Sequence, residues 1–297
     1  MMAVIWYPGH MHKAQKQIKE VMHQVDLVIE VMDARIPFSS ENPAVKELRG
    51  PRPCLKVLNK SDLADPAVTA EWLRHFSQQE GVRAIALTTT RKGESRKILG
   101  LCREMVPLRA QRGEPVRTMI MGIPNVGKST LINALAGRAI AKVGDEPAVT
   151  KQQQRISLGN GIVLSDTPGI LWPRMEDQNS GYRLAVTGAI KNTAITFEDI
   201  AVFAGEFLLQ HYPQALMARY KLSELPDGAT ALLEAVGRKR GCLRPGGVVD
   251  LHKASEILLK EFRSGILGGI SLETPAIFDV IEEDDSEEPE TDLNPSD

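Results

Sequence analysis

A glycine-rich loop between a predicted strand and a predicted helix constrains the fold of this chain more than any other feature. Residues Gly122 to Ser129 match the pattern G-x-x-x-x-G-K-[ST]. The glycines let backbone N–H groups wrap around phosphates, and the N-terminus of the next helix adds partial positive charge. A chance glycine turn is the alternative, and the flanking strand and helix make it the weaker interpretation. The loop therefore predicts a nucleotide-binding α/β fold.

The pattern of apolar runs predicts a parallel sheet. Runs at 27–32, 54–58, 82–87 and 116–121 alternate with helical patterns, the clearest at 66–79 and 95–106. Such alternation favours parallel strands, with functional loops at their carboxyl ends. Two more strands, 153–158 and 161–166, are expected to form a hairpin at Gly159-Asn160-Gly161. A short amphipathic helix is expected over 12–25. We therefore expect a three-layer α/β/α domain over residues 1–174.

The rest of the chain lacks strand patterns. Its best marked helix has Asp250 as the expected N-cap and Gly265 as the closing glycine. A smaller all-helical domain is expected over 175–275. Residues 276–297 hold ten acidic side chains and no Lys or Arg, which is typical of a disordered tail. A solubility appendage is the favoured interpretation of that tail.

Two further motifs narrow the nucleotide to GTP. Asp166-Thr-Pro-Gly169 ends a predicted strand, where the carboxylate can hold Mg²⁺ and the Gly N–H can meet the γ-phosphate. Asn59-Lys60-Ser61-Asp62 ends another strand, where a carboxylate can accept two hydrogen bonds from guanine N1 and N2. Taken alone, Asn-Lys-Ser-Asp is more often an ordinary polar turn. Its occurrence with the other two motifs at strand ends predicts a guanine site.

The order of the motifs is unusual. In ordinary GTPases the phosphate loop comes first and the guanine motif last. Here the guanine motif at 59–62 precedes the phosphate loop at 122–129, and the Asp-Thr-Pro-Gly motif at 166–169 comes last. A circular permutation explains this order. It also places the Asp-Thr-Pro-Gly segment, a candidate switch, directly before the helical region.

At this point the chain resembles the circularly permuted GTPases, specifically the ribosome biogenesis GTPases of the YlqF/RbgA type. The resemblance covers residues 4–273. It is carried by Trp6-Tyr-Pro-Gly-His10-Met11, Asp33-Ala-Arg-Ile-Pro37, Asn59-Lys-Ser-Asp62, the loop at 122–129, Asp166-Thr-Pro-Gly-Ile170, the Arg-rich segment 238–244 and Phe262-Arg-Ser-Gly-Ile-Leu-Gly268. It implies a cytoplasmic GTPase that acts late in assembly of the large (50S) ribosomal subunit and is stimulated by the particle.

The resemblance also implies roles for individual residues. His10 matches the histidine that positions the attacking water in this family, with His12 as the lower-ranked rival. From the residues alone, a structural or RNA-contacting role for His10 stays open. The chain itself has Ile170 where many GTPases carry the water-orienting Gln. Asn125 matches an Asn that helps to hold K⁺, although a loop-shaping role without an ion stays open. Thr88 and Thr89 lie where the family places its last guanine-contacting turn, in a register that the Thr run leaves open.

These assignments define the predicted site. Guanine is expected to bind to Asn59, Lys60, Asp62, Thr88 and Thr89. The phosphates are expected to bind to Asn125, Val126, Gly127, Lys128, Ser129, Thr130 and Gly169. Mg²⁺ is expected to bind to Ser129, Thr150 and Asp166, with Thr150 as the switch residue that also reaches the γ-phosphate.

Charge and composition bear on partners. Without the acidic tail the chain has 36 basic and 28 acidic residues, a net charge of +8, which favours a polyanionic partner. Arg238, Lys239, Arg240 and Arg244 are candidate contacts to ribosomal RNA, with a solvated surface as the plainer alternative. No apolar run is long enough to span a membrane. Three scattered cysteines fit a reducing cytosol. The protein is expected to be a cytoplasmic monomer.

The predicted function is a GTP-hydrolysing assembly factor that binds GTP or GDP, ribosomal RNA and ribosomal proteins. Hydrolysis by the free protein is expected to be slow, because it lacks both the Gln and an arginine finger. Two alternatives remain at this point. The chain could be an RNA-binding module that uses GTP only as an ordering ligand, or a regulatory GTPase that acts on a protein partner.

Overall fold

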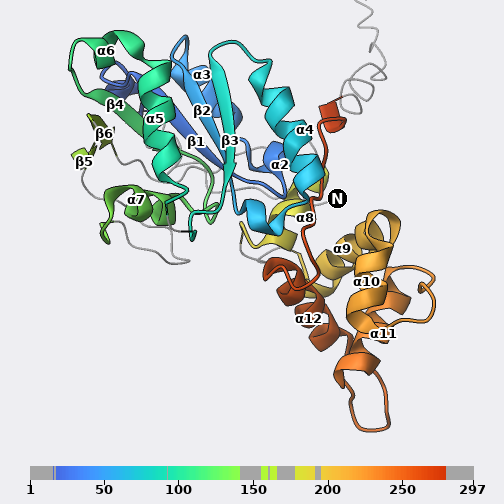
Figure 1. Cartoon of the computed structure of the whole chain (residues 1–297). Helices are drawn as coiled ribbons and strands as arrows, with labels where there is room; N and C mark the ends of the chain where they lie inside the picture. Colours follow the sequence, from blue (N-terminus) through green and yellow to red (C-terminus); the bar gives the residue numbers. More distant parts are fainter. Residues whose placement is uncertain are drawn as a thin grey trace, which may run out of the picture.

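The computed structural model describes residues 16, 18–91, 93–140, 155–159, 161–165, 178–190 and 195–278. They form a six-stranded sheet in the order β3-β2-β1-β4-β6-β5 (Figure 1). Every neighbouring pair is parallel except β5 and β6, which form the predicted antiparallel hairpin. The strands are β1 Leu27–Asp33, β2 Cys54–Asn59, β3 Val82–Leu87, β4 Val116–Met121, β5 Arg155–Gly159 and β6 Ile162–Ser165.

The course of the chain through the sheet fixes the place of a ligand site. The chain runs outward from β1 through β2 to β3, and then returns to the other side of β1 with β4. Strand order therefore reverses between β1 and β4. In open α/β sheets the crevice beyond the carboxyl ends of such a pair is where ligands bind. The guanine motif follows β2 and the phosphate loop follows β4, so both lie at this edge.

Helices cover both faces of the sheet and give the predicted three layers. The alternate side chains Val28 and Met32 of β1 pack with helical residues 18–22 and with α3 (Pro43–Arg49) and α4 (Pro66–Ser77). The side chains of Leu27, Ile29 and Val31 lie on the other face of the sheet and pack with α5 (Arg96–Met105) and α7 (Lys128–Ala136). Every residue of β1 is buried, as expected for a central parallel strand. Shorter elements complete this part: α2 Pro37–Ser40, η1 Ser61–Leu63 and α6 Pro107–Gln111.

The second half of the described chain is helical. Helix α8 lies between the sheet and a group of four helices, α9 to α12, which we call the helical lobe (Figure 1). The bounds are α8 Gln178–Thr187, α9 Phe197–His211, α10 Pro213–Tyr220, α11 Ala229–Arg240 and α12 Leu251–Arg263. Asp250 caps α12 as predicted, by accepting a hydrogen bond from Lys253 N, and Gly265 follows the helix with a φ of +73°. The apolar core is continuous from this lobe to one face of the sheet.

The chain then returns to the sheet domain in a segment that we call the C-terminal strap, residues 266–278. Ile270 N donates to Leu63 O at 3.0 Å, directly beside the guanine motif. Trp72 Nε1 of α4 donates to Glu273 O at 3.1 Å. At the end of the strap the Phe278 ring stacks on His75, with centroids 4.9 Å apart. The strap therefore ties the helical lobe to the loop after β2 and to α4.

The described residues cover only part of the two predicted domain boundaries. The boundary at residue 174 lies outside the described residues. The acidic tail was predicted from residue 276, and of it only 276–278 are described, as part of the strap. Among the helices that the structure describes, none has the length and apolarity to cross a membrane.

Candidate functional site

The phosphate loop is packed so closely that two of its glycines admit no side chain. At Gly122 the φ is +145°, and a Cβ atom would lie 2.4 Å from Val31 O. At Gly127 the φ is +99°, and a Cβ would lie 2.2 Å from Asn59 Nδ2. Such distances are far below van der Waals contact, so only glycine fits. The loop therefore passes over the end of β1 and lies against the guanine motif.

The loop leads directly into α7, whose N-terminus faces the loop. Gly127 is the N-cap and Lys128 the first helical residue, so Ser129 and Thr130 lie in the first turn. The first turn of a helix points its N–H groups away from the helix and carries partial positive charge, which favours an anion. Lys128 Nζ donates to Ile123 O at 2.5 Å, which holds the ammonium group across the loop. This arrangement is that of a phosphate-binding cradle.

Asn59 joins the guanine motif to the phosphate loop. Its buried amide Nδ2 donates to Val126 O at 2.7 Å, and its Oδ1 accepts from Thr89 N at 3.2 Å. One side chain thus holds the loops that follow β2, β3 and β4 together. The sequence predicted Asn59 as a guanine contact, and the structure adds this bracing role. This same amide nitrogen is the atom that leaves no room for a side chain at Gly127.

Asp62 and Thr88, both predicted to contact guanine, lie against each other. Thr88 Oγ1 donates to Asp62 Oδ1 at 3.0 Å and lies 3.2 Å from Asp62 N. Thr88 is anchored in turn, because its N–H donates to Glu94 Oε2 at 2.8 Å. The carboxylate therefore stands in a defined position at the sheet edge.

Lys60 belongs to a charged network that sequence reasoning missed. Its Nζ donates to Asp33 Oδ2 at 2.9 Å and to Asn125 O of the phosphate loop at 2.8 Å. Arg35 binds the same carboxylate through Nε at 2.9 Å and Nη2 at 2.7 Å. Burial alone raises the pKa of Asp33, but Arg35 and Lys60 outweigh it and hold that pKa well below its ordinary value. Asp33 and Arg35 entered the sequence analysis only within a family motif.

Several predicted site residues lie outside the described residues: His10, Thr150, Asp166 and Gly169. Of the three predicted Mg²⁺ ligands, Ser129 alone is described. Asn125 has a φ of +59°, and its amide nitrogen donates to Gly188 O and Ala189 O at 3.3 and 3.4 Å. Its side chain therefore contacts the end of α8. Within the described ranges, no three His, Cys, Asp or Glu side chains gather as a metal site.

The predicted RNA-binding residues lie far along the helical lobe and are engaged with other groups of the protein. Arg238, Lys239 and Arg240 form the last turn of α11, and Arg244 follows in a loop. Arg238 pairs with Glu234 at 2.7 Å, Arg240 with Glu261 at 3.0 Å and Arg244 with Asp250 at 3.1 Å. Lys239 Nζ donates to Lys221 O. The cluster is basic, with much of its charge balanced locally.

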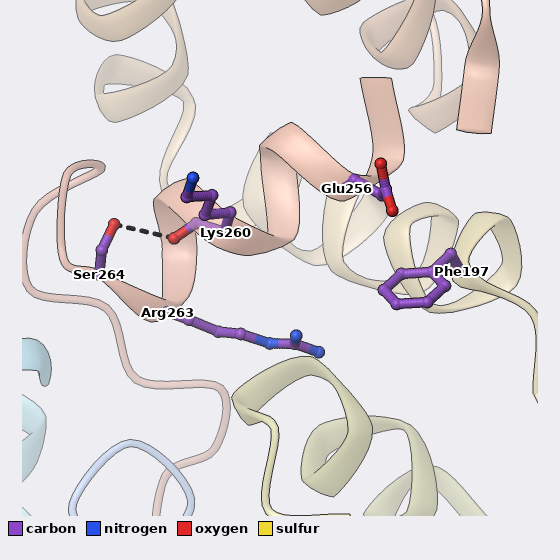
Figure 2. Close-up of a pocket in the computed structure, with 5 residues that line it drawn as sticks. All are labelled: Phe197, Glu256, Lys260, Arg263 and Ser264. Atoms are coloured by element: carbon purple, nitrogen blue, oxygen red, sulfur yellow. Dashed lines mark hydrogen bonds between the residues drawn. The ribbon is translucent and has the colours of Figure 1, made fainter. Parts of the chain in front are cut away.

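An open cavity of about 560 Å³ lies elsewhere, between α12 and the start of α9. It is lined by Phe197, Glu256, Lys260, Arg263 and Ser264 (Figure 2). None of these residues belongs to the nucleotide motifs. The nucleotide motifs meet instead at the carboxyl edge of the sheet, where Asn59 joins them.

The fold and the joined loops define a class. A phosphate loop after β4, braced by an Asn-Lys-Ser-Asp loop after β2, is the arrangement of a P-loop GTPase. Because β1, β2 and β3 precede the phosphate-loop strand in the chain, the motifs occur in circularly permuted order.

Comparison with known proteins places the chain more narrowly. Residues 117–204 match the protein family described as 50S ribosome-binding GTPase. The chain is 45% identical over 284 residues to ribosome biogenesis GTPase A from Bacillus cereus, covering 93% of this chain and 96% of the relative. It is 35% identical to mitochondrial ribosome-associated GTPase 1 from Bos taurus, over 90% and 88% of the two chains. The crystal structure of GNP-bound YlqF from T. maritima matches with a TM-score of 0.61 and 30% identity, over 89% and 98% of the two chains.

This chain belongs to the ribosome biogenesis GTPase A family, and it is a GTPase. The resemblance inferred from the motifs is thereby confirmed, as is the permuted P-loop fold.

Proposed function

We propose that this GTPase is an assembly factor for the large (50S) ribosomal subunit, which binds ribosomal RNA in the particle while it holds GTP and leaves after hydrolysis. The names of its relatives support action on the ribosome. One observation carries the nucleotide part of the proposal: the 2.7 Å hydrogen bond from Asn59 Nδ2 to Val126 O, which joins the guanine motif to the phosphate loop. A single nucleotide can then touch both.

In this proposal the base is read at the ends of β2 and β3. The Asp62 carboxylate accepts hydrogen bonds from guanine N1 and N2, a pair of donors that adenine does not offer. Thr88 holds that carboxylate, and Asn59 and Thr89 form the wall beside it. Lys60 lies between the base site and the phosphate loop.

The phosphates bind the loop after β4 and the first turn of α7. Lys128 contacts the β- and γ-phosphates, and the backbone N–H groups of residues 125–130 surround them. Ser129 supplies a hydroxyl to Mg²⁺, together with Thr150 and Asp166, and Gly169 meets the γ-phosphate. Mg²⁺ neutralises phosphate charge during hydrolysis. The Oδ1 atom of Asn125 is the ligand that this side chain offers to K⁺, because its nitrogen is bound to Gly188 O and Ala189 O.

Hydrolysis uses a positioned water, and His10 is the proposed group that positions it. Ile170 occupies the place of the usual Gln and has no hydrogen-bonding atoms in its side chain. The free protein should therefore hydrolyse GTP slowly, and the ribosomal particle should accelerate it.

The helical lobe is the proposed contact to ribosomal RNA, through Arg238, Lys239, Arg240 and Arg244. Because three of these residues already pair with carboxylates, phosphate groups would have to compete for them. Binding should then weaken steeply as salt rises. We further propose the domain limits 1–174, 175–275 and 276–297, a monomeric state and a cytoplasmic location.

Substitution of Asp62 tests the nucleotide site. Asn at this position keeps one acceptor oxygen, so it cannot accept from both guanine N1 and N2, and its NH₂ group can donate to the 2-carbonyl of xanthine. We expect the wild-type protein to prefer GTP over ATP by about 10⁴-fold or more, and Asp62→Asn to lose GTP and gain XTP. Asp227→Asn, a change in an exposed loop, is the control. Equal binding of ATP and GTP by the wild type would end the proposal.

Co-sedimentation tests the partner. With a non-hydrolysable GTP analogue, the protein should pellet with 50S particles at low salt and be released as salt rises; with GDP it should stay in the supernatant. His10→Ala should bind the particles but fail to leave them after GTP is added. If binding is the same with both nucleotides, the proposed cycle is wrong. Comparison of hydrolysis in K⁺ and in Na⁺ tests the role of Asn125.

A further inference from the structure

Arg35 lies between the guanine motif and the helical lobe. It lies two residues after the end of β1, and it is only 1% exposed. On one side its guanidinium donates two hydrogen bonds to the Asp33 carboxylate. The same carboxylate accepts a hydrogen bond from Lys60 Nζ. A two-armed pair of this kind fixes both the distance and the orientation of the carboxylate. The position of Arg35 therefore determines the position of Asp33.

On its other side Arg35 contacts the helical part of the chain. Its Nη2 lies 3.4 Å from Thr187 O, in the last turn of α8. Its guanidinium carbon lies 5.4 Å from the centre of the Phe262 ring of α12, within cation–π range. The buried Nη1 has no hydrogen-bond partner among the described residues. The charge of Arg35 is thus stabilised on one side by Asp33 and on the other by α8 and α12.

The end of α8 is held from three directions. Arg263 reaches from α12 (Figure 2) and donates to Ala185 O at 2.7 Å and to Val186 O at 2.8 Å. Arg35 contacts Thr187 O, and Asn125 of the phosphate loop contacts Gly188 O. Cations and amide donors at a helix C-terminus satisfy its unpaired carbonyls. A shift of α12 would consequently move α8 and Arg35 together.

Lys60 depends on this arrangement for its own position. It has a left-handed backbone conformation, with φ +59°, which is unusual for a residue other than glycine. Two hydrogen bonds hold its ammonium group, one to Asp33 Oδ2 and one to Asn125 O. If Asp33 turns away, the ammonium loses its charged partner and swings from the phosphate loop.

We propose that Arg35 is a positioning residue of the guanine site: through Asp33 it holds Lys60 against the phosphate loop, and through Thr187 and Phe262 it couples guanine-nucleotide affinity to the position of the helical lobe. This rests on the proposed function, because it takes the Asn-Lys-Ser-Asp loop as the base-binding loop. The consequence is that a partner that displaces the lobe changes nucleotide affinity without touching the nucleotide.

A double-mutant cycle on GDP binding tests the first part. Arg35→Lys keeps a cation near Asp33 but loses the two-armed geometry. We expect it to weaken GDP binding about tenfold, the equivalent of about 1.4 kcal/mol. In a Lys60→Met background the same change should have no further effect, because Arg35 acts through Lys60. A merely structural role of Arg35 predicts the opposite, namely the same loss in both backgrounds, and that result would overturn the proposal.

Phe262→Leu tests the coupling to the lobe. It keeps apolar volume in α12, removes the ring beside the guanidinium and leaves the Arg35–Asp33 pair in place. We expect about a threefold loss of GDP affinity that disappears in Lys60→Met. Phe203→Leu is the matched control, because that ring stacks on Tyr182 of α8 and should leave affinity unchanged. If Phe262→Leu behaves like this control, the coupling is wrong. Phe262→Leu also decides the matter if Arg35→Lys fails to fold.

Asp62→Asn separates this inference from the proposed function. If Asp62→Asn leaves the preference for GTP intact, the base-binding loop itself has been misassigned. If Asp62→Asn abolishes that preference while Arg35→Lys and Phe262→Leu bind GDP as the wild type does, the base site stands and the positioning role of Arg35 is refuted.

Discussion

Two buried carboxylates on β1, only three residues apart, have opposite electrostatic surroundings. Asp33, at the nucleotide edge, is bound by two cations, Arg35 and Lys60. Glu30, in the middle of the strand, faces Lys56 at 3.7 Å, and Lys56 also binds Glu41. The first cluster has more cations than carboxylates and the second has fewer. Burial is almost complete in both, so this ratio decides which carboxylate stays charged.

The pKa values follow the ratio. Arg35 and Lys60 hold the pKa of Asp33 well below its ordinary value despite burial. Burial raises the pKa of Glu30 to about 7, since the attraction of Lys56 is too small to offset it and Glu41 adds repulsion. A protonated Glu30 leaves one Lys and one Glu, a neutral cluster. The cluster at the edge where a nucleotide binds thus carries a net charge, whereas protonation of Glu30 leaves the cluster inside the sheet without one.

The largest effect should come from breaking the Asp33 cluster. Asp33→Asn leaves Arg35 buried without its counter-charge, and we expect a loss of about 3–5 kcal/mol in the free energy of unfolding. Glu30→Gln should cost under about 1 kcal/mol at pH 7, because Lys56 keeps Glu41. Urea unfolding of the nucleotide-free variants at pH 7 measures both. Equal losses would show that the charge ratio is not what distinguishes the two sites.

The pH dependence of Asp33 has a defined sign. A pKa lowered by folding means that the carboxylate stabilises the native state above the unfolded pKa near 4. That contribution is lost as the pH falls below this value. The destabilisation by Asp33→Asn should therefore be full at pH 7 and shrink in acid.

Glu273 of the strap sharpens the comparison, because it is a buried carboxylate on a different segment of the chain. It accepts from Ser39 N at 2.9 Å and from Ser39 Oγ at 2.7 Å, with Arg183 at 3.7 Å. Burial raises its pKa from 4.5 to about 7, more than Arg183 and Ser39 lower it. Here the sign is reversed: the native state binds the proton more tightly, so stability falls as pH rises from about 4.5 through 7.

Glu273→Gln should remove that dependence. Gln can still accept from Ser39 N and donate to Ser39 Oγ, so its hydrogen bonds are kept. Relative to the wild type, the variant should gain up to about 3 kcal/mol in unfolding free energy between pH 5 and pH 8. Thermal melts at a series of pH values measure this gain. Glu224→Gln, a change in the exposed loop between α10 and α11, is the control and should show no such trend.

Local patterns predicted much of the fold. The phosphate loop, the helix cap at Asp250 and the antiparallel pairing of β5 with β6 depend on residues close together in the sequence, so local patterns could predict them. The runs 27–32 and 54–58 are apolar except for one charged residue in each. Glu30 and Lys56 are direct register partners on adjacent strands, and that pairing explains how both can be buried. Periodicity within one strand cannot reveal it.

For the candidate site, the motifs name residues but say little about the contacts between them. The motifs place Asn59, Asp62 and Thr88 at one edge of the sheet. They do not predict that Asn59 donates a hydrogen bond to Val126 O. Contacts over long separations were invisible, such as that of Ser39 with Glu273, 234 residues away. No local pattern encodes them, because they depend on how the strap and the lobe pack on the sheet.

The smallest effect on stability is expected at the surface, where Arg238 pairs with Glu234 one turn earlier on α11. Both side chains are exposed, and such pairs contribute about 0.3–0.5 kcal/mol. Arg238→Ala should therefore barely change the melting temperature, in contrast to Asp33→Asn. If Arg238 contacts an RNA phosphate, the slope of log affinity for 50S particles against log salt should become shallower by about one.

Glu234→Ala is the matched control for that measurement. It breaks the same ion pair and costs the same small amount of stability, but it removes the carboxylate that competes with phosphate for Arg238. Its affinity for the particles should be equal to or higher than that of the wild type. A fall in affinity in both variants would mean that the pair acts by holding α11 in place. A fall in Arg238→Ala alone, at unchanged melting temperature, would assign the charge to RNA.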